Sequence, residues 1–327
     1  MSFSQITAFP NGISSFGIPQ LSGGLLPFPG NYFFVNPATG ADGNTGSADS
    51  PLSTLAAAYG RCQDNHDDVV FLVGSTTNTH RLAATLVWAK NNTHLVGLSA
   101  PTQVGQRARI SNLAAAFFSP LVQVTAAGCM FLNFSTFIGF VAPATQVAWQ
   151  DSGQRNYYGN VDLSSFGSTQ SAGDTGSRSL LLDGVGLGES TFEHCYFGVD
   201  TITRGVQNAN LEFQNGNTRN TFRDCTFAMD ASAATPVAIL CAAAASIDRW
   251  NMFERCRFIN AIGSGATAMT GAAKLVASAG GILLFDSCSL VGISSFAYDA
   301  ASKAQIYMAN TPVPDPGVHA GEAINPA

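Results

Sequence analysis

A six-residue pattern, Phe-x-x-Cys-x-Phe, recurs along the second half of the chain and constrains its fold more than any other feature. It reads FEHCYF at 192–197, FRDCTF at 222–227, FERCRF at 253–258 and FDSCSL at 285–290. The four cysteines are separated by 30, 31 and 32 residues. Self-similarity at a nearly constant period indicates a solenoid, in which each repeat buries its apolar face only against its neighbours.

The repeating units have the composition of strands rather than helices. They contain Phe, Tyr, Val, Ile and Thr in short runs, and these runs are interrupted by Gly, Asn and Ser. That composition is typical of strands and turns. A coil of this length with several short strands predicts a parallel β-helix.

The pattern also predicts which side chains fill the core. Side chains alternate between two faces along a strand, so Cys195 and Phe197 share a face. Phe192 joins them only if the chain turns between Phe192 and Cys195. The predicted core ladder is Phe192, Cys195, Phe197, Phe222, Cys225, Phe227, Phe253, Cys256, Phe258, Phe285 and Cys288.

The two residues between each Phe and Cys are then placed at an outward corner. The first corner position is Glu193, Arg223, Glu254 and Asp286 in successive coils, and the second is His194, Asp224, Arg255 and Ser287. Over the first three coils the charges alternate in sign. Because stacked strands lie about 4.8 Å apart, we expect these residues to form a ladder of surface ion pairs.

The cysteines are interpreted as core residues, because a free thiol behaves as a small hydrophobe. Metal sites favour local spacings such as Cys-x2-Cys, and the four repeat cysteines do not have them. The chain has seven cysteines, an odd number. We therefore expect no metal, no cofactor and no disulfide scaffold, and synthesis in a reducing compartment.

Composition excludes some classes of partner. Charged residues make up 11% of the 327 residues, against about 25% in ordinary soluble proteins. A continuous solenoid core and an extensive subunit interface would both account for this. A net charge of −6 argues against binding to nucleic acid, and no apolar run approaches the length of a membrane span. The first residues have neither a basic nor a hydrophobic signal region.

Residues 1–30 are rich in Gly, Pro, Ser and Phe and show neither helical nor strand periodicity. A disordered tail is normally polar, whereas this segment is apolar. We therefore expect an extended arm that docks on its own body or on a neighbouring subunit. The candidate contact residues are Phe3, Phe9, Ile13, Phe16, Ile18 and Phe28. The Pro-rich residues 311–327 are expected to form an extended tail.

Residues 31–111 read as a strand, a Gly/Asp/Asn loop, a short helix and further strands at 68–74, 86–89 and 94–98. Ser50 is the expected helix N-cap, with Pro51 at the first helical position. Leu52, Leu55 and Tyr59 then share one helical face. The loop ATGADGNTGSADS lacks the ligand pattern of a calcium loop, which predicts a structural turn.

This pattern resembles the N-terminal cap and first coils of right-handed parallel β-helix proteins, the pectate-lyase-like and phage-tailspike-like superfamily. The resemblance rests on Val35-x4-Gly40-x-Asp42-Gly43-Asn44-x-Gly46 and on Pro51-Leu52-x-Thr54-Leu55-x2-Ala58. It implies an all-β protein, a right-handed parallel β-helix over residues 31–310. Residues 31–75 would form the cap and first coil and would hide the unpaired strand edges.

Residues 151–179 are polar, rich in Gly and Ser, and weakly patterned. We expect an excursion from the side of the solenoid, where binding residues often lie. Arg155, Tyr157 and Tyr158 are its candidate contact residues. A surface loop without any contact is the alternative.

The sequence predicts no enzyme. A polysaccharide hydrolase needs two carboxylates about 5–9 Å apart. The acids at the corners are expected to pair with basic neighbours, and no nucleophile motif is present. Other acids that could face a groove are Asp183, Glu189, Asp200 and Glu212.

The arm followed by the cap resembles structural proteins of phage virions. This resemblance implies a structural virion protein of a tailed bacteriophage, assembled in the host bacterial cytoplasm. It would be a capsid decoration protein, a homotrimer that binds the major capsid protein or another virion protein through its arm. Two alternatives stay open. One is a tailspike or fibre depolymerase that cleaves polysaccharide, and the other is an adhesin that binds a host surface glycan without turnover.

Overall fold

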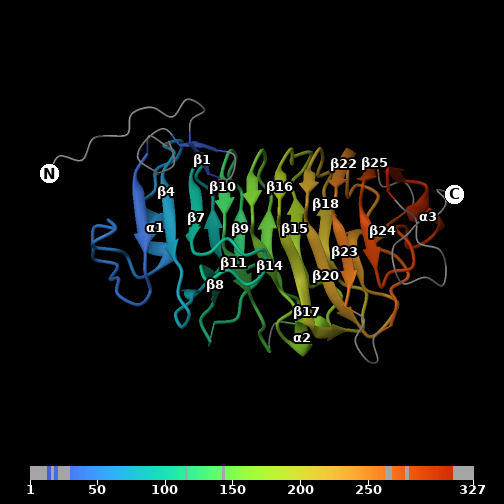
Figure 1. Cartoon of the computed structure of the whole chain (residues 1–327), viewed down its shortest axis with the longest axis horizontal. Coiled ribbons are helices and arrows are strands. Elements are labelled where there is room, and N and C mark those ends of the chain that lie inside the picture. The colour runs from blue at the N-terminus through green and yellow to red at the C-terminus, as the bar shows by residue number, and fades with distance from the viewer. Residues whose placement is uncertain are drawn as a thin grey trace.

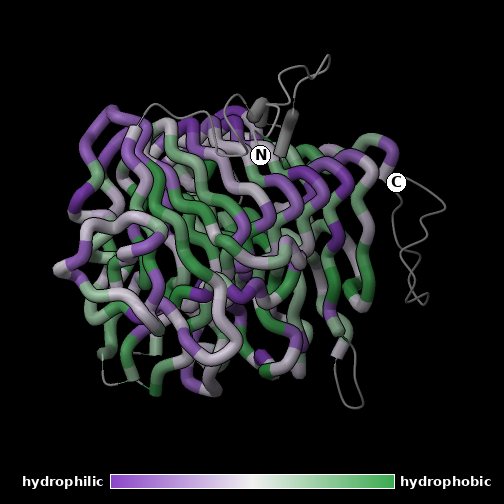
Figure 2. Tube along the Cα trace, turned by 60° about the vertical axis from the view of Figure 1, so that its left-hand side comes forward, coloured by the Kyte–Doolittle hydropathy of each residue, from purple (hydrophilic) through white to green (hydrophobic). Residues whose placement is uncertain are grey.

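The computed structural model describes residues 30–114, 116–141, 144–261, 267–276 and 280–311, together with the backbone of residues 13–15 and 18–20. The chain winds into a right-handed parallel β-helix whose coils are stacked along the long axis of the molecule (Figure 1). The predicted fold class is confirmed. Figure 2 shows that hydrophobic segments of successive coils lie beside one another.

Three parallel sheets form the body, and each of the seven coils from β4 to β24 contributes one strand to each sheet. Sheet one contains β3 (Tyr32–Val35), β4 (Val69–Val73), β7 (His94–Leu98), β10 (Met130–Leu132), β13 (Tyr157–Gly159), β16 (Thr191–Glu193), β19 (Thr221–Arg223), β22 (Arg249–Glu254), β25 (Gly281–Asp286) and β27 (Ile306–Ala309). Sheet two contains β5 (His80–Leu82), β8 (Arg109–Asn112), β11 (Ser135–Phe137), β14 (Asp162–Ser164), β17 (Tyr196–Arg204), β20 (Thr226–Ala231), β23 (Arg257–Asn260) and β26 (Ser289–Val291). Sheet three contains β6 (Leu86–Trp88), β9 (Val122–Val124), β12 (Val147–Asp151), β15 (Arg178–Asp183), β18 (Ala209–Gln214), β21 (Val237–Cys241) and β24 (Ala273–Leu275).

The corner between sheets one and two explains the repeated motif. One residue there adopts a left-handed conformation in successive coils, with φ of 55° at His194, 53° at Asp224, 51° at Arg255 and 54° at Ser287. This single residue turns the chain between the Phe and the Cys, so both side chains enter the core. The predicted turn is confirmed, although the left-handed region is uncommon for residues other than glycine.

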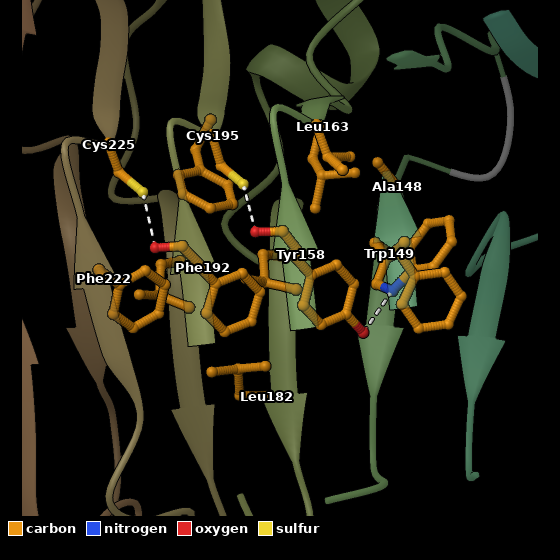
Figure 3. Packing of buried hydrophobic residues seen from close by; sticks show 14 of the residues in the cluster. Ala148, Trp149, Tyr158, Leu163, Leu182, Phe192, Cys195, Phe222 and Cys225 are labelled. Atoms are coloured by element: carbon orange, nitrogen blue, oxygen red, sulfur yellow. Dashed lines mark hydrogen bonds between the residues drawn. The ribbon is translucent and has the colours of Figure 1, made fainter. Parts of the chain in front are cut away.

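The aromatic rings of the motif stack into columns inside the solenoid (Figure 3). In the first column, ring centroids are 4.5 Å apart for Tyr158 and Phe192, 4.6 Å for Phe192 and Phe222, 4.7 Å for Phe222 and Phe253, and 5.0 Å for Phe253 and Phe285. In the second column they are 4.8 Å apart for Phe197 and Phe227 and 4.9 Å for Phe227 and Phe258. Stacked pairs contribute about 0.5–1.5 kcal/mol each beyond burial. The predicted core ladder is confirmed.

The repeat cysteines are fully buried beside these columns. Each thiol donates to a backbone carbonyl of the preceding coil: Cys195 to Tyr158 at 3.5 Å, Cys225 to Phe192 at 3.4 Å, Cys256 to Phe222 at 3.4 Å and Cys288 to Phe253 at 3.2 Å. Burial raises the pKa of the Cys225 thiol well above its ordinary value. The same cause raises the pKa of Cys129 to about 11. These cysteines are packing residues, as predicted.

A second ladder, of neutral polar side chains, lies just before β13, β16 and β19 and inside β22 of sheet one. Its members are Asn156, Ser190, Asn220 and Asn251, all buried. Each side-chain oxygen accepts from a backbone N–H of the preceding coil: Asn156 from Cys129 at 2.9 Å, Ser190 from Asn156 at 3.1 Å, Asn220 from Ser190 at 3.1 Å and Asn251 from Asn220 at 3.0 Å. The ladder satisfies backbone donors that would otherwise be buried without a partner.

At the N-terminal end, α1 (Leu55–Arg61) packs against β3, β4 and β5. The predicted N-cap at Ser50 is wrong: the cap is Thr54, whose Oγ1 accepts from Ala57 N at 3.2 Å. Leu52 pairs with β3 through its backbone, which keeps residues 50–52 extended. The carboxylate of Asp42 accepts from the backbone and hydroxyl groups of Ser53 and Thr54, and this contact sets the start of the helix.

The predicted excursion at 151–179 is wrong. Residues 157–159 and 162–164 form β13 and β14, which are ordinary members of sheets one and two. Only the connection to β15 leaves the sheets, and it contains the short helix α2 (Thr169–Ala172). The coil looks irregular in sequence because Tyr158 stands opposite Phe192 of the next coil and buried Asp162 stands opposite Tyr196, so the Phe and Cys of the motif are both absent from it.

The terminal segments lie mostly outside the described residues, and so do the predicted contact residues Phe3, Phe9, Phe16 and Phe28 and the tail from residue 312. Of Ile13 and Ile18 only the backbone is described: β1 (Ile13–Ser15) and β2 (Ile18–Gln20) form an antiparallel pair. A third short helix, α3 (Ala300–Lys303), precedes β27. No helix within the described ranges is long and apolar enough to cross a membrane.

Candidate functional site

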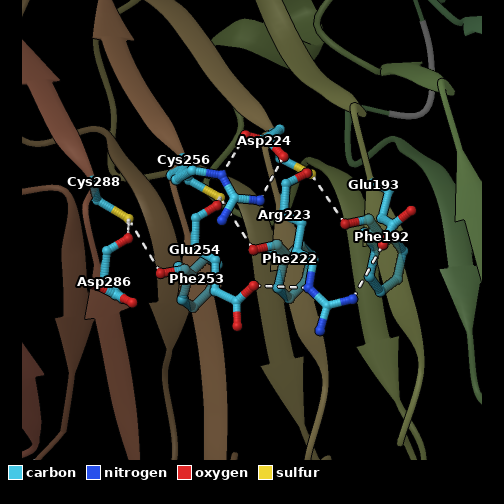
Figure 4. Close-up of polar contacts among 12 residues, drawn as sticks. Phe192, Glu193, Phe222, Arg223, Asp224, Phe253, Glu254, Cys256, Asp286 and Cys288 are labelled. Atoms are coloured by element: carbon cyan, nitrogen blue, oxygen red, sulfur yellow. Dashed lines mark hydrogen bonds and ion pairs between the residues drawn. The ribbon is translucent and has the colours of Figure 1, made fainter. Parts of the chain in front are cut away.

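The corner acids form the predicted ladder of ion pairs (Figure 4). Arg223 lies between two glutamates, with its NH1 3.2 Å from Glu193 Oε1 and its Nε 2.7 Å from Glu254 Oε2. At the second corner position Arg255 binds Asp224 at 2.8 Å. The alternation of sign is confirmed. Because Arg223 is half-exposed, each of its pairs contributes only about 0–1 kcal/mol, so the ladder sets register more than stability.

Acids elsewhere on the solenoid are also held by neighbours. Arg155 and Arg219 approach Glu189 at 2.8 and 2.6 Å and lower the pKa of its carboxyl. Glu212 forms a buried pair with Arg178 at 2.7 Å. These carboxylates are therefore part of the scaffold. Among the described residues, no group of three or more His, Cys, Asp or Glu side chains is placed to hold a metal ion.

The three predicted loop contacts are not brought together on a surface. Tyr158 is a core residue with no exposed surface, and its hydroxyl donates to Asp151 at 2.7 Å. Tyr157 lies on the outer face of sheet one, where its hydroxyl donates to Glu193 at 2.8 Å. Only Arg155 is well exposed, and it is engaged by Glu189. The prediction failed for Tyr158 because neighbouring residues of a strand point to opposite faces.

Two buried acids have raised pKa values. Burial raises the pKa of Asp151, which accepts from Tyr158, Asn156 and Gly153. Burial raises the pKa of Asp162 to about 6, and the carboxylate accepts from Gly105 N at 2.9 Å and from the Ser164 hydroxyl at 2.9 Å. Perturbed acids can mark functional sites. Here the segment that contains Gly105 covers Asp162, so a polymeric substrate would not reach it.

A groove lies over the outer face of sheet two, and we call it the sheet-two groove. It consists of two adjoining hollows, of about 510 and 730 Å³, that share Thr79 and Arg81. Strands β5, β8 and β11 form its floor. The lining residues that matter below are Arg81, Arg109, Leu113, Phe117, Phe137 and Val141.

The groove combines exposed apolar side chains with two arginines. Phe117 is 52% exposed and Phe137 is 47% exposed, and Val141 projects further still. Arg81 donates to Asn112 O at 2.8 Å, and the Nε of Arg109 has no hydrogen-bond partner among the described residues. Neither hollow is lined by a described Asp or Glu. This composition is typical of a protein-binding surface, where aromatic residues and arginine are enriched.

Sequence reasoning missed this groove. Its arginines and aromatic residues come from separate coils, and each coil contributes one or two of them. The only local signal was the outward position of Arg81 between two buried residues in β5. That signal is too common to predict a site.

Comparison with known proteins shows the fold alone. No protein-family model and no curated protein sequence matches this chain. The pectin methylesterase of Aspergillus niger shares the fold with a TM-score of 0.56 and 14% identity, over 91% of each chain. Pectin methylesterase PemA from Erwinia chrysanthemi has a TM-score of 0.53 and 15% identity, over 87% of this chain and 91% of that one. Pectate lyase Pel9A has a TM-score of 0.52 and 13% identity, over 79% of this chain and 62% of its own.

Proposed function

We propose that this chain is a structural protein of a tailed-bacteriophage virion, without enzymatic activity, that attaches to another virion protein through the sheet-two groove. The observation that carries the proposal is the groove itself, with exposed Phe117 and Phe137 beside Arg81 and Arg109. Buried aromatic and arginine anchors dominate protein–protein affinity. An outer face of this kind fits attachment to a protein surface.

The placement of the acids supports a structural role. A polysaccharide hydrolase needs two carboxylates, one of which is free to donate a proton. Glu189, Glu193 and Glu254 are instead bound to arginines, and Glu212 is buried against Arg178. The low content of charged residues also suits a chain that buries further surface by association. Self-association as a homotrimer is part of the proposal.

The second candidate is a glycan-binding or glycan-cleaving protein. The observation that favours it is the pair of arginines without a neighbouring acid in the groove, which suits an anionic sugar. The solved structures with this fold include a pectin methylesterase and a pectate lyase by name. A glycan-active protein would bind an anionic sugar in the sheet-two groove and would need no protein partner there.

The test is quantitative mass spectrometry of purified virions, combined with attachment of groove variants to particles. We expect a constant copy number per particle, and we expect Phe137→Asp with Arg81→Glu to lose attachment at least tenfold. Val185→Asp is the matched control, because Val185 is highly exposed on a turn after β15, away from the groove. Absence from particles, together with binding or cleavage of a polysaccharide by the wild type, would favour the second candidate.

A further inference from the structure

Arg204 is a fully buried cation in the body of the solenoid. It is the last residue of β17, and it stands opposite Ala231 of β20, a core residue. Its side chain has no exposed surface. An arginine is almost never buried to this extent unless it is paired, so the surroundings of Arg204 decide what the position can bind.

The protein supplies Arg204 with one hydrogen-bond acceptor. Its Nη2 donates to Asn210 Oδ1 of β18 at 2.6 Å, and this bond joins sheet two to sheet three. The Cζ of the guanidinium lies 4.2 Å from the centre of the Phe166 ring, whose face attracts a cation. The Nε and Nη1 atoms are buried and have no hydrogen-bond partner among the described residues. Two nitrogen donors of the guanidinium are therefore left over.

The charge of Arg204 is not balanced by a carboxylate. None of the ion pairs among the described residues includes it. The charge that acts on it is a second cation, Arg178, whose Nε is bound to Glu212 at 2.7 Å. Burial, followed by the charge of Arg178, lowers the pKa of Arg204 to about 9. The guanidinium is still charged at neutral pH, so two arginines share one carboxylate and one positive charge remains.

An unpaired buried charge is strongly unfavourable. A water molecule would satisfy an N–H group of Arg204 but would leave its charge, whereas an anion would do both. The preceding coil adds two buried hydroxyls that have no partner among the described residues. One is Ser165 Oγ, next to Phe166 in the chain. The other is Ser179 Oγ, level with Asn210 in the register of sheet three.

The remaining charge and the close packing limit the kind of ion. One positive charge has to be balanced, and a doubly charged ion such as sulfate would bring a larger dehydration cost and an excess negative charge. Phe166 and Asn210 already occupy two sides of the guanidinium. We propose that a small monovalent inorganic anion, such as chloride, binds inside the solenoid against Nε or Nη1 of Arg204. The ion stabilises the junction of sheets two and three and is independent of the sheet-two groove.

Crystals of the full chain grown in sodium bromide test the proposal directly. Bromide substitutes for chloride and scatters X-rays anomalously. We expect one anomalous peak within hydrogen-bonding distance of Nε or Nη1 of Arg204. Anomalous peaks on the surface alone, or a water without anomalous signal at Arg204, would overturn the proposal. This measurement needs only the wild-type chain, so it holds even where a variant fails to fold.

Urea denaturation gives a second test in solution. Sodium chloride is varied at constant ionic strength against sodium gluconate, whose anion is too large for the position. Once chloride exceeds its dissociation constant, each tenfold rise in chloride should lower the unfolding equilibrium constant about tenfold. A wild-type midpoint that does not depend on chloride would overturn the proposal.

Two variants assign this dependence to one residue. Arg204→Met removes the charge but keeps a long unbranched side chain, and it should abolish the dependence on chloride. Arg219→Met is the matched control, because Arg219 is partly exposed and pairs with Glu189 on the surface; it should keep the dependence of the wild type. An equal dependence in Arg204→Met would mean that chloride acts elsewhere, and the proposal would be wrong.

Discussion

Replacing Asn220 by alanine should destabilise the β-helix strongly, because Asn220 is a rung of the buried polar ladder. Its Oδ1 accepts from Ser190 N at 3.1 Å. Its Nδ2 donates to Asn217 Oδ1 at 2.6 Å and to Asn251 Oδ1 at 2.8 Å. Asn251 keeps a second bond, from Asn220 N, so alanine leaves two buried groups without partners.

The magnitude follows from those two groups. A buried polar group that loses its partner costs about 1–3 kcal/mol, so Asn220→Ala should cost about 2–6 kcal/mol. The preceding coil supplies a matched control, because Ser190 occupies the same rung and accepts from Asn156 N at 3.1 Å. Asn220→Ser should therefore keep the bond to Ser190 N and cost only about 1–3 kcal/mol, since Asn217 alone is left unpaired.

Urea denaturation followed by circular dichroism measures both variants against the wild type. The midpoint should fall in the order wild type, serine, alanine, with an unchanged slope. Equal costs for the two substitutions would refute the reasoning, because it assigns separate contributions to the two groups. A cost below about 1 kcal/mol for alanine would show that water or a shifted neighbour satisfies them.

Three further predictions concern the ladders and the buried titratable groups. Arg223→Ala should change the unfolding free energy by no more than about 1 kcal/mol, as measured by urea titration, and a larger loss would mean that the ladder is stabilising. The Cys225 thiol should not react with Ellman's reagent until the protein unfolds, and a rapidly reacting thiol would contradict its burial. Cys225→Ser should lower the free energy of unfolding by about 1–3 kcal/mol, because the shorter C–O bond moves the hydroxyl away from its carbonyl acceptor. Burial lowers the pKa of His80 and of His94 to about 4, below the unfolded value of about 6.5, so their contribution to stability is lost as pH falls from about 6.5 through 4. Asp162, with its pKa raised to about 6, acts in the opposite direction between about 6 and 4. Asp151, whose pKa burial also raises, opposes the loss as well, so the prediction concerns a variant. The urea midpoint of Asp162→Asn should fall more steeply on acidification through this window than that of the wild type, and an equal or smaller fall would refute the assignment.

The repeating part of the fold could be predicted from the sequence. The Phe-x-x-Cys-x-Phe spacing gave the coil length, the inward residues and the corner between Phe192 and Cys195. It also placed Glu193 and Arg223 beside each other. These predictions succeed because a parallel ladder puts equivalent positions of successive coils in contact, so one motif determines its own neighbours.

The coil that contains Tyr158 could not be predicted in this way. It keeps an aromatic residue at the core position but lacks the cysteine motif, and its corner residue is Asn160. Buried Asp162 and Ser164 are satisfied by partners in other segments, among them Gly105 and Gly198. Such partners are distant in sequence. A polar coil of the solenoid and a polar surface loop therefore look the same from composition.

The helix start illustrates a smaller error of the same kind. Ser50 and Pro51 have the composition of a helix N-terminus, but Leu52 N bonds to Phe34 O of β3. The Asp42 carboxylate accepts hydrogen bonds from the backbone of Ser53 and Thr54, so the N-cap is Thr54, four residues after Ser50. Tertiary hydrogen bonds decide between two acceptable caps, and local propensity cannot rank them.

Some residues of this solenoid occupy positions that repeat from coil to coil, and others do not. This difference helps to locate a functional surface. Residues at the repeated positions of the four motif coils, such as Phe222, Cys225 and Arg223, are explained by their contacts with the coils before and after them. The residues of the sheet-two groove are only partly explained in this way, since Arg81 and Arg109 donate to Asn112 O and Thr76 O of neighbouring coils. Arg109 keeps a buried nitrogen without a described partner, and Phe137 leaves about half of its surface in water, although each occupies a regular strand. Both features are available to the attachment that we propose, so the groove, rather than the ladder that reveals the fold, is where we propose to look for a partner.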